Sequence, residues 1–160
     1  MKILIVSDSH GNTRSLEKAL SAEADADAAV FLGDGLRDME WLEDAHPGLR
    51  VYSVSGNCDF ASFTPNEGLA PFGGVVVFYT HGHLYGVKNG PDTLAATAKA
   101  RGAQVALYGH THAAACEEID GVTLFNPGAI SGGRGAAGRA GYGVMTVTDG
   151  KAAFVHKTLA

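Results

Sequence analysis

The sequence has few cysteines and no long apolar segment, which excludes two classes of protein. Its only cysteines, Cys58 and Cys116, are too few for the disulfide framework of a small secreted domain. No stretch approaches the roughly 18–20 consecutive apolar residues that a membrane-spanning helix requires. The chain does not start like a secretory signal, because the apolar run Ile3–Val6 is too short and Ser-Asp-Ser-His follows it. We therefore expect a cytoplasmic protein with no membrane partner.

Positive charge is also scarce. Lys and Arg together number 12 against 17 Asp and Glu, which gives a formal net charge of −5 at pH 7. A nucleic-acid-binding protein usually carries a basic face, so the composition argues against a nucleic-acid partner and against a nuclease. The length of 160 residues suits one domain, and 46% apolar residues can form a substantial core. We expect a single domain over residues 1–160.

What the sequence does have is a series of short apolar runs, each bounded by turn residues. Such runs are typical of strands that are buried on both faces. The runs are Lys2–Ser7, Ala29–Leu32, Val51–Ser55, Val75–Thr80 and Val105–Tyr108. Helical spacing of apolar residues between them predicts helices at Thr13–Ala22, Leu36–Asp44 and Asp92–Ala100. Asn12 or Thr13 would cap the first helix, and the acidic residues of the second would form a solvated face.

The pattern changes after residue 113, where strands follow one another without helices. The expected strands are Ala113–Ile119, Val122–Phe125, Tyr142–Thr148 and Ala152–Thr158. Asp-Gly pairs at 120–121 and 149–150 predict tight hairpin turns. The Gly-rich segment Ser131–Gly141 has almost nothing to bury, so we expect a mobile surface loop. The element order predicts an α/β fold of two packed sheets flanked by helices.

Each of the first five apolar runs ends on side chains that can bind a metal ion. Ligand crevices of open α/β sheets lie beyond the carboxyl ends of the strands, so these side chains should converge. Their carboxylate, imidazole and amide groups suit Mn²⁺, Fe²⁺, Zn²⁺, Ni²⁺ or Co²⁺ better than Ca²⁺ or Mg²⁺. Seven ligands are too many for one tetrahedral ion, which favours two divalent transition-metal ions with one carboxylate bridging them. The candidates are Asp8, His10, Asp34, Asn57, His81, His110 and His112.

Local spacing supports this interpretation. Residues two apart in an extended segment point to the same side, so Asp8 and His10 could face one ion, as could His110 and His112. Glycines stand next to several candidates and would remove side-chain bulk where the chain crowds a metal.

The ordered set Asp8-x-His10, Gly33-Asp34, Gly56-Asn57, His81 and Gly109-His110-Thr111-His112 resembles the calcineurin-like metallophosphoesterase superfamily. Three further segments resemble its small YfcE/MJ0936-like group of phosphodiesterases. These are Gly56-Asn57-Cys58-Asp59, Thr80-His81-Gly82-His83 and Asn126-Pro127-Gly128. The resemblance covers nearly the whole chain.

The resemblance implies a four-layer αββα sandwich and a dinuclear metal site. Asp8, His10, Asp34 and His112 would hold the first ion, and Asp34, Asn57, His81 and His110 the second, with Asp34 as the bridge. The implied activity is hydrolysis of a small phosphodiester, and also of phosphomonoesters, by a hydroxide that bridges the two ions. The resemblance to small members of the group also implies a homodimer or homotetramer.

One position departs from the wider superfamily, which has a His after the Asn of Gly-Asn that resembles a general acid. Here that position is Cys58, and a thiol is a poor proton donor to an alkoxide. The candidates for the acid are therefore Asp59, His83 and solvent, although His83 could equally be a loop residue. Arg134 and Arg139 are expected to be solvated, with a phosphate contact as the less favoured alternative.

The alternative function is a non-catalytic protein-binding scaffold. The same fold resembles the retromer subunit Vps29, whose metal pocket is degraded and whose surface recruits partners. The distinguishing feature is the number of ligands, and this sequence retains all seven. The enzyme is therefore the favoured interpretation.

Overall fold

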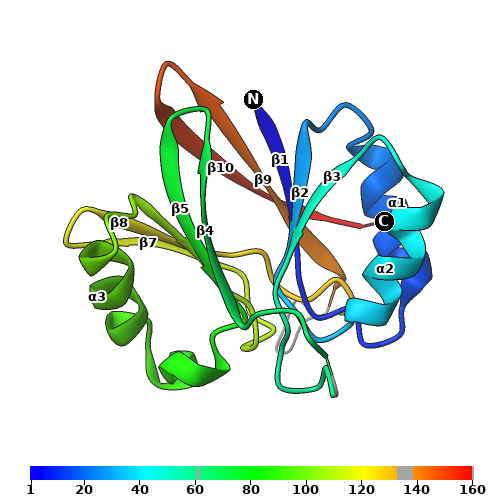
Figure 1. Cartoon of the computed structure of the whole chain (residues 1–160), viewed down its shortest axis with the longest axis horizontal. Helices are drawn as coiled ribbons and strands as arrows, with labels where there is room; N and C mark the ends of the chain where they lie inside the picture. The colour runs from blue at the N-terminus through cyan, green and yellow to red at the C-terminus, as the bar shows by residue number, and fades with distance from the viewer. Residues whose placement is uncertain (61, 133–138, 160) are drawn as a thin grey trace.

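The computed structural model describes residues 1–60, 62–132 and 139–159 and consists of two five-stranded sheets that pack face to face. Helices cover the outer face of each sheet, which gives the expected order of helix, sheet, sheet and helix (Figure 1). No helix among the described residues is long and apolar enough to cross a bilayer.

The first sheet has the strand order β10-β9-β1-β2-β3. Strands β1, β2 and β3 run parallel, and β9 and β10 join them as an antiparallel hairpin. Helices α1 and α2 connect the parallel strands and lie together on the outer face (Figure 1). The bounds are β1 Lys2–Val6, α1 Thr13–Ala22, β2 Ala28–Phe31, α2 Leu36–Ala45, β3 Arg50–Ser53, β9 Gly141–Thr148 and β10 Lys151–Thr158.

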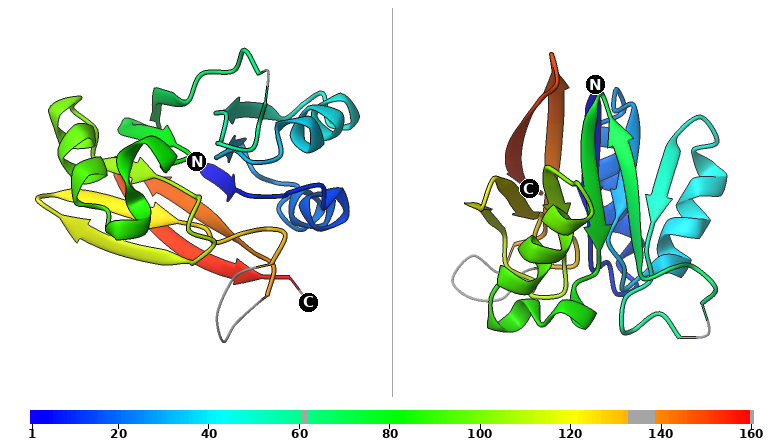
Figure 2. Two further views of the ribbon diagram at one scale, coloured as in Figure 1. Left: turned by 90° about the horizontal axis from the view of Figure 1, so that it is seen from below. Right: turned by 60° about the vertical axis from the view of Figure 1, so that its left-hand side comes forward.

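The second sheet has the strand order β4-β5-β6-β8-β7. Helix α3 and two short 3₁₀ turns lie on its outer side, opposite α1 and α2 (Figure 2). The bounds are β4 Glu67–Phe72, β5 Val75–Thr80, η1 His83–Tyr85, η2 Val87–Asn89, α3 Asp92–Ala100, β6 Val105–Leu107, β7 Ala115–Ile119 and β8 Val122–Asn126.

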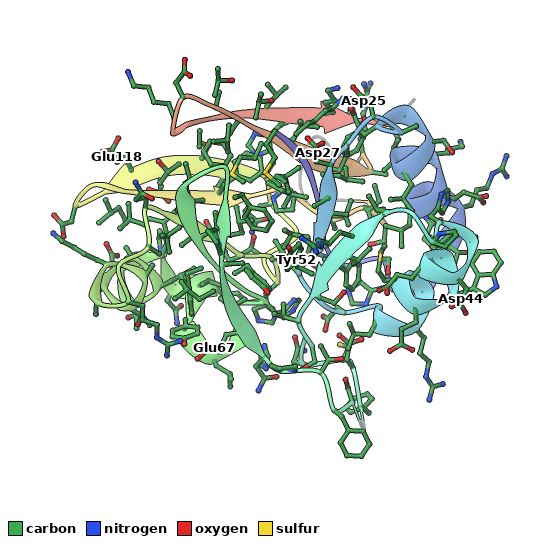
Figure 3. The ribbon with its side chains drawn as sticks, turned by 45° about the horizontal axis from the view of Figure 1, so that its top comes forward. Asp25, Asp27, Asp44, Tyr52, Glu67 and Glu118 are labelled. Atoms are coloured by element: carbon green, nitrogen blue, oxygen red, sulfur yellow. The ribbon has the colours of Figure 1, made fainter. Side chains whose placement is uncertain are left out.

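Alternation along β1 explains why the parallel strands are apolar throughout. Ile3 and Ile5 belong to the core between the sheets, whereas Leu4 and Val6 pack against α1 and α2. Tyr52 of β3 contributes to the core between the sheets, where its ring makes edge-on contacts with Phe72 and Tyr79 of the second sheet; Figure 3 labels it. Burial on both faces therefore requires both the helices and the second sheet.

Most expected elements are confirmed, including α1 and α3 with their bounds and the Asn12 cap, whose side chain accepts from the Ser15 amide. Both Asp-Gly turns are confirmed, because Asp120 and Asp149 have positive φ like the glycines after them. Strand β4 was not expected. It contains Gly68 and Pro71, which a central strand would not tolerate but an edge strand does. Most of the expected loop at 131–141, residues 133–138, lies outside the described residues.

A buried carboxylate ties α1 to the first sheet. Glu23, at the end of α1, is only 4% exposed. It accepts a hydrogen bond from the Tyr142 hydroxyl at 2.9 Å, and the ammonium groups of Lys157 and Lys2 lie 2.5 Å and 2.7 Å from its two oxygens. Burial alone would raise the pKa of Glu23, but these three donors lower it to about 2.

Replacing this carboxylate should make stability depend less on pH. The pKa of Glu23 is depressed in the folded state, so its contribution is complete above the ordinary value of 4.5 and is lost as the pH falls toward 2. We expect Glu23→Gln to lower the free energy of unfolding by about 1–3 kcal/mol at pH 7 and by much less near pH 2. Urea unfolding at both pH values would measure this.

The matched control is Asp25→Asn, which removes a carboxylate whose side chain is 74% exposed and lies in the loop after α1 (Figure 3). That change should lower the free energy of unfolding at pH 7 by less than Glu23→Gln does, because solvent screens an exposed ion pair. Equal losses for Glu23→Gln at the two pH values would show that shape, and not charge, is what Glu23 contributes.

Candidate metal centre

The seven candidate ligands lie at one edge of the molecule, the lower edge in Figure 1, which Figure 2 (left) views from below. Each follows the carboxyl end of a strand. The first sheet supplies four and the second sheet three. They are Asp8 and His10 after β1, Asp34 after β2, Asn57 after β3, His81 after β5, and His110 and His112 after β6.

Five of the seven have a left-handed backbone, which is uncommon for residues with a side chain. Among the described non-glycine residues, the only others with positive φ are the two hairpin aspartates. This corrects the premise of an extended geometry, because Asp8 and His10 converge through a left-handed turn. Strain of this kind, of order 1–3 kcal/mol per residue, is typical of functional sites. The φ values are 58° for Asp8, 43° for His10, 60° for Asp34, 70° for His110 and 60° for His112.

Asp8, His10 and His112 form the first cluster. Their ligand atoms all lie within 4.8 Å of one another. The His112 Nε2 is 3.1 Å from the Asp8 Oδ1 and 3.3 Å from the His10 Nε2. Two imidazole nitrogens and one carboxylate oxygen thus converge on a single point.

Asp34, His81 and His110 form the second cluster, again with ligand atoms within 4.8 Å. The His81 Nε2 is 3.3 Å from the Asp34 Oδ2 and 3.1 Å from the Asn57 Oδ1. Its Nδ1 lies 2.6 Å from the carbonyl oxygen of Leu32. That contact assigns the ring proton to Nδ1 and leaves the Nε2 lone pair facing the cluster.

Asp34 lies between the two clusters. Its Oδ2 is 3.7 Å from the His10 Nε2 of the first cluster as well as 3.3 Å from His81. The clusters also meet on the other side, where the His81 Nε2 is 3.9 Å from the Asp8 Oδ1. The arrangement is one continuous site with a carboxylate at its centre.

The electrostatics of the site fit a bound cation. The Asp8 Oδ1 is buried and has no hydrogen-bond partner, although a buried carboxylate oxygen normally needs one. Burial and the neighbouring His81 lower the pKa of His110 to about 4, so its lone pair is free at neutral pH. Burial would also lower the pKa of His81, but the hydrogen bond to Asp34 and the charge of Asp8 raise it, because two carboxylates face the ring.

Two glycines allow the backbone to approach the carboxylates closely. A Cβ at Gly56 would lie 2.1 Å from the Asp34 Oδ1, and one at Gly109 would lie 2.1 Å from the Ser7 Oγ and 2.8 Å from the Asp8 Oδ2. No side chain fits at either position without moving a candidate ligand. The expectation that glycines make room here is confirmed.

Asp59 fastens the loops that carry Asp34 and Asn57. Its Oδ1 accepts from the amides of Gly35 and Leu36, and its Oδ2 accepts from the amides of Asp34 and Gly56, all at 2.7–3.0 Å. Four amide donors occupy the carboxylate, so its contacts are those of a residue that positions the site.

Two further residues position the site in ways that sequence reasoning missed. Asp38, expected on a solvated face, accepts from the Ser9 hydroxyl at 2.6 Å and the Gly11 amide at 2.8 Å, and so holds the loop around His10. The buried Asn126 donates to the Gly109 carbonyl at 3.1 Å and the Thr111 hydroxyl at 2.9 Å, on either side of His110. For Asp38 the available signal was its place in the first turn of a helix that starts beside a candidate ligand.

The remaining candidates lie around the rim. Cys58 is exposed, and its sulfur is within 4.8 Å of ligand atoms of His10 and Asp34. The His83 ring is 5.4 Å from that of His81 and 6.2 Å from that of His110. Arg139 is exposed, and Arg134 lies outside the described residues.

Comparison with known proteins agrees with this geometry. The model of the calcineurin-like phosphoesterase superfamily domain matches residues 1–150. The chain is 39% identical over 132 residues to the "probable metallophosphoesterase YsnB" of Bacillus subtilis, covering 81% of this chain and 75% of that protein. It is 31% identical to the phosphodiesterase YfcE of Escherichia coli K12, covering 91% and 87%.

Solved structures show the same fold. A structure from Streptococcus pneumoniae described as a predicted phosphoesterase has a TM-score of 0.79 and 25% identity, and the match covers 98% of this chain and 97% of that one. Vps29 of Chaetomium thermophilum has a TM-score of 0.78 at 19% identity over 99% and 97%, a likeness of fold alone. With a family model that matches nearly its full length and relatives at this level of identity, the chain belongs to the calcineurin-like phosphoesterase superfamily.

Proposed function

We propose that this protein is a metal-dependent phosphodiesterase that binds two divalent transition-metal ions at the strand ends described above. The observation that carries the proposal is the buried, unpartnered Asp8 Oδ1, which faces imidazole nitrogens of both clusters at 3.1–3.9 Å. A buried carboxylate oxygen without a hydrogen bond is costly, and a cation held between it and the imidazole nitrogens would offset that cost.

The contacts support a division of the ligands between two ions. Asp8, His10 and His112 would hold the first ion, His81, His110 and Asn57 would hold the second, and Asp34 would bridge them. When bound, such a pair of ions supplies an acidified water as nucleophile and neutralises charge on the phosphoryl oxygens. Mn²⁺, Ni²⁺, Co²⁺, Fe²⁺ and Zn²⁺ all suit this mixture of oxygen and nitrogen donors.

The protein's own contribution is to hold the ligands before substrate arrives. Asp59 and Asp38 fix the loops of the first sheet, and Asn126 fixes the loop of the second. The Leu32 carbonyl fixes the orientation of the His81 ring. A small phosphoester is the substrate class, and phosphomonoesters are included in the proposal. The cytoplasmic location and the homodimer or homotetramer expected above remain predictions.

The proton for the leaving oxygen has no obvious donor in this site. Loss of water around the sulfur, which neighbouring residues partly cover, and the charge of Asp34 raise the pKa of the Cys58 thiol, which makes it a still weaker acid. The carboxylate of Asp59 is occupied by four amides. Burial lowers the pKa of His83, so it is mostly neutral at pH 7. The acid role of Asp59 or His83 therefore stays a prediction, and these contacts favour His83 over Asp59.

Metal removal and return provides the first test of the function. Chelation should abolish hydrolysis of bis(p-nitrophenyl) phosphate, and Mn²⁺, Ni²⁺ or Co²⁺ should restore it, with two ions per chain by elemental analysis. If the loaded protein hydrolyses neither this diester nor p-nitrophenyl phosphate, the scaffold function expected from the likeness to Vps29 replaces the proposal.

If Asp34 bridges the two ions, its substitution should reduce activity more than substitution of a residue that binds one ion. Asp34→Asn should weaken both ions and reduce kcat/KM by more than His10→Gln or His110→Gln does, with a loss of at least about 100-fold. Metal titration followed by calorimetry would check whether both sites weaken together. The control is Asp44→Asn, which replaces an exposed carboxylate on α2. It should change neither kcat/KM nor the affinity for metal. Retention of one tight ion in Asp34→Asn would contradict the bridge.

Because Cys58 is a poor acid, we expect the rate of hydrolysis to depend strongly on the pKa of the leaving group. Without a placed acid, aryl diesters should be hydrolysed far faster than alkyl or nucleoside diesters, because phenolate departs without a proton. Proton donation by a placed side chain is worth about 10²–10⁴-fold. Cys58→His should therefore reduce the difference in hydrolysis rate between aryl and alkyl diesters. A series of diesters whose leaving groups have graded pKa values would measure this. A flat dependence in the native protein would instead show that another group, such as His83, already donates the proton.

A further inference from the structure

A cavity of about 770 Å³ opens beside the metal centre. His10, Asp34 and Cys58 form its inner end. Its walls are the start of α2 on one side and, on the other, residues 58–60 and 62–64, which lie between β3 and β4. Its volume lies in the range of sites for whole organic ligands, and it greatly exceeds what a phosphoryl group occupies.

Two aromatic side chains in the outer part of this cavity are exposed to solvent. Phe60 and Phe63 both line it, with exposed fractions of 83% and 103%. Phenylalanine is normally buried, and exposed apolar groups beside a polar site often mark a binding surface. Leu36, at the start of α2, adds apolar surface to the opposite wall.

The charges of the cavity argue against a strongly anionic occupant. Two lining carboxylates, Asp38 and Asp59, are held by amide and hydroxyl donors of the protein. The lining carries four carboxylates, those of Asp34, Asp38, Glu40 and Asp59, against the single guanidinium of Arg37, so its net charge is negative. Aromatic rings beside carboxylates that repel further negative charge suit a flat, uncharged ring system that has polar edges, which is the chemistry of a nucleobase.

We propose that Phe60, Phe63 and the first turn of α2 form a subsite for an aromatic substituent of the phosphoester, with nucleoside phosphates as the substrate class. The inference rests on the proposed function, because the subsite is defined by its continuity with the metal centre. Phe60 and Phe63 act as specificity-determining residues. They contact the ring and take no part in bond cleavage.

Binding of two simple phosphates to the Mn²⁺-loaded protein tests the subsite. Thymidine 5′-monophosphate and methyl phosphate carry the same anionic group but differ in the ring, and calorimetry gives the ratio of their Kd values. We expect thymidine 5′-monophosphate to bind at least about tenfold more tightly, as base stacking on aromatic side chains allows. Phe60→Ala/Phe63→Ala should bring the ratio close to one.

The control is Leu69→Ala, which removes an exposed apolar side chain of β4 outside the cavity and should leave the ratio unchanged. Thermal unfolding should also be unchanged in the double variant, because both rings are exposed in the folded protein. A ratio near one in the native protein, or a preference that survives the double substitution, overturns the subsite.

Two further results separate this inference from its alternatives. If p-nitrophenyl methyl phosphate is hydrolysed but the binding ratio is near one, the proposed function stands and the subsite is wrong. If the ratio depends on the two phenylalanines but no phosphoester is hydrolysed, the subsite stands and the proposed function fails. If the double variant converts a dimer into a monomer in sedimentation without changing the ratio, the rings cover a second copy of the chain, and the subsite is wrong.

Discussion

The contact between the two sheets is the constraint on which the site depends. Four candidate ligands come from the first sheet and three from the second, so neither cluster of candidate ligands is complete within one sheet alone. The core between the sheets, with residues such as Ile5, Val77 and Phe125, sets the distance between the two groups. Polar contacts continue this interface into the site, where the Leu32 carbonyl meets His81 and the Asp8 carboxylate accepts from the His110 amide at 3.1 Å. Folding and assembly of the site are therefore the same event.

The residues of the site also adopt backbone angles and degrees of burial that are unfavourable for their residue types. Five residues that carry side chains have left-handed backbones, two of them are buried aspartates, and all five belong to clusters whose ligand atoms lie within 4.8 Å of one another. Amide donors from three loops oppose this cost, and a bound cation would oppose it further, since any ligand that binds only the folded state stabilises that state. A preformed cradle of this kind requires little rearrangement when the ions bind.

Much of this could be predicted from the sequence, because short apolar runs followed by ligand-type residues are local patterns. Helices α1 and α3 and both Asp-Gly hairpins were predictable for the same reason. Strand β4 was not, since Gly68 and Pro71 oppose strand formation in any position except an edge, and the position in a sheet is not a local property.

Within the site, the identity of the candidate ligands was predictable but their backbone geometry was not. Left-handed angles at Asp8 and His10 are imposed by contacts with distant segments, such as the hydrogen bonds from their amides to the carbonyls of Gly33 and Asp34. The holding roles of Asp38 and Asn126 likewise depend on loops that only the folded chain brings together.

Pro71 of β4 has a consequence for the behaviour of the protein at high concentration. The amide and carbonyl of its partner Val76 both point toward Gln104, so Pro71 and Val76 form a pair without mutual hydrogen bonds. The nitrogen of Pro71 therefore faces the open side of the sheet, where it has no hydrogen to offer. An approaching strand from another molecule would meet a gap in the row of donors near the end of β4. The ring thus protects the margin of the second sheet from growth into intermolecular β-structure without the loss of any bond within it.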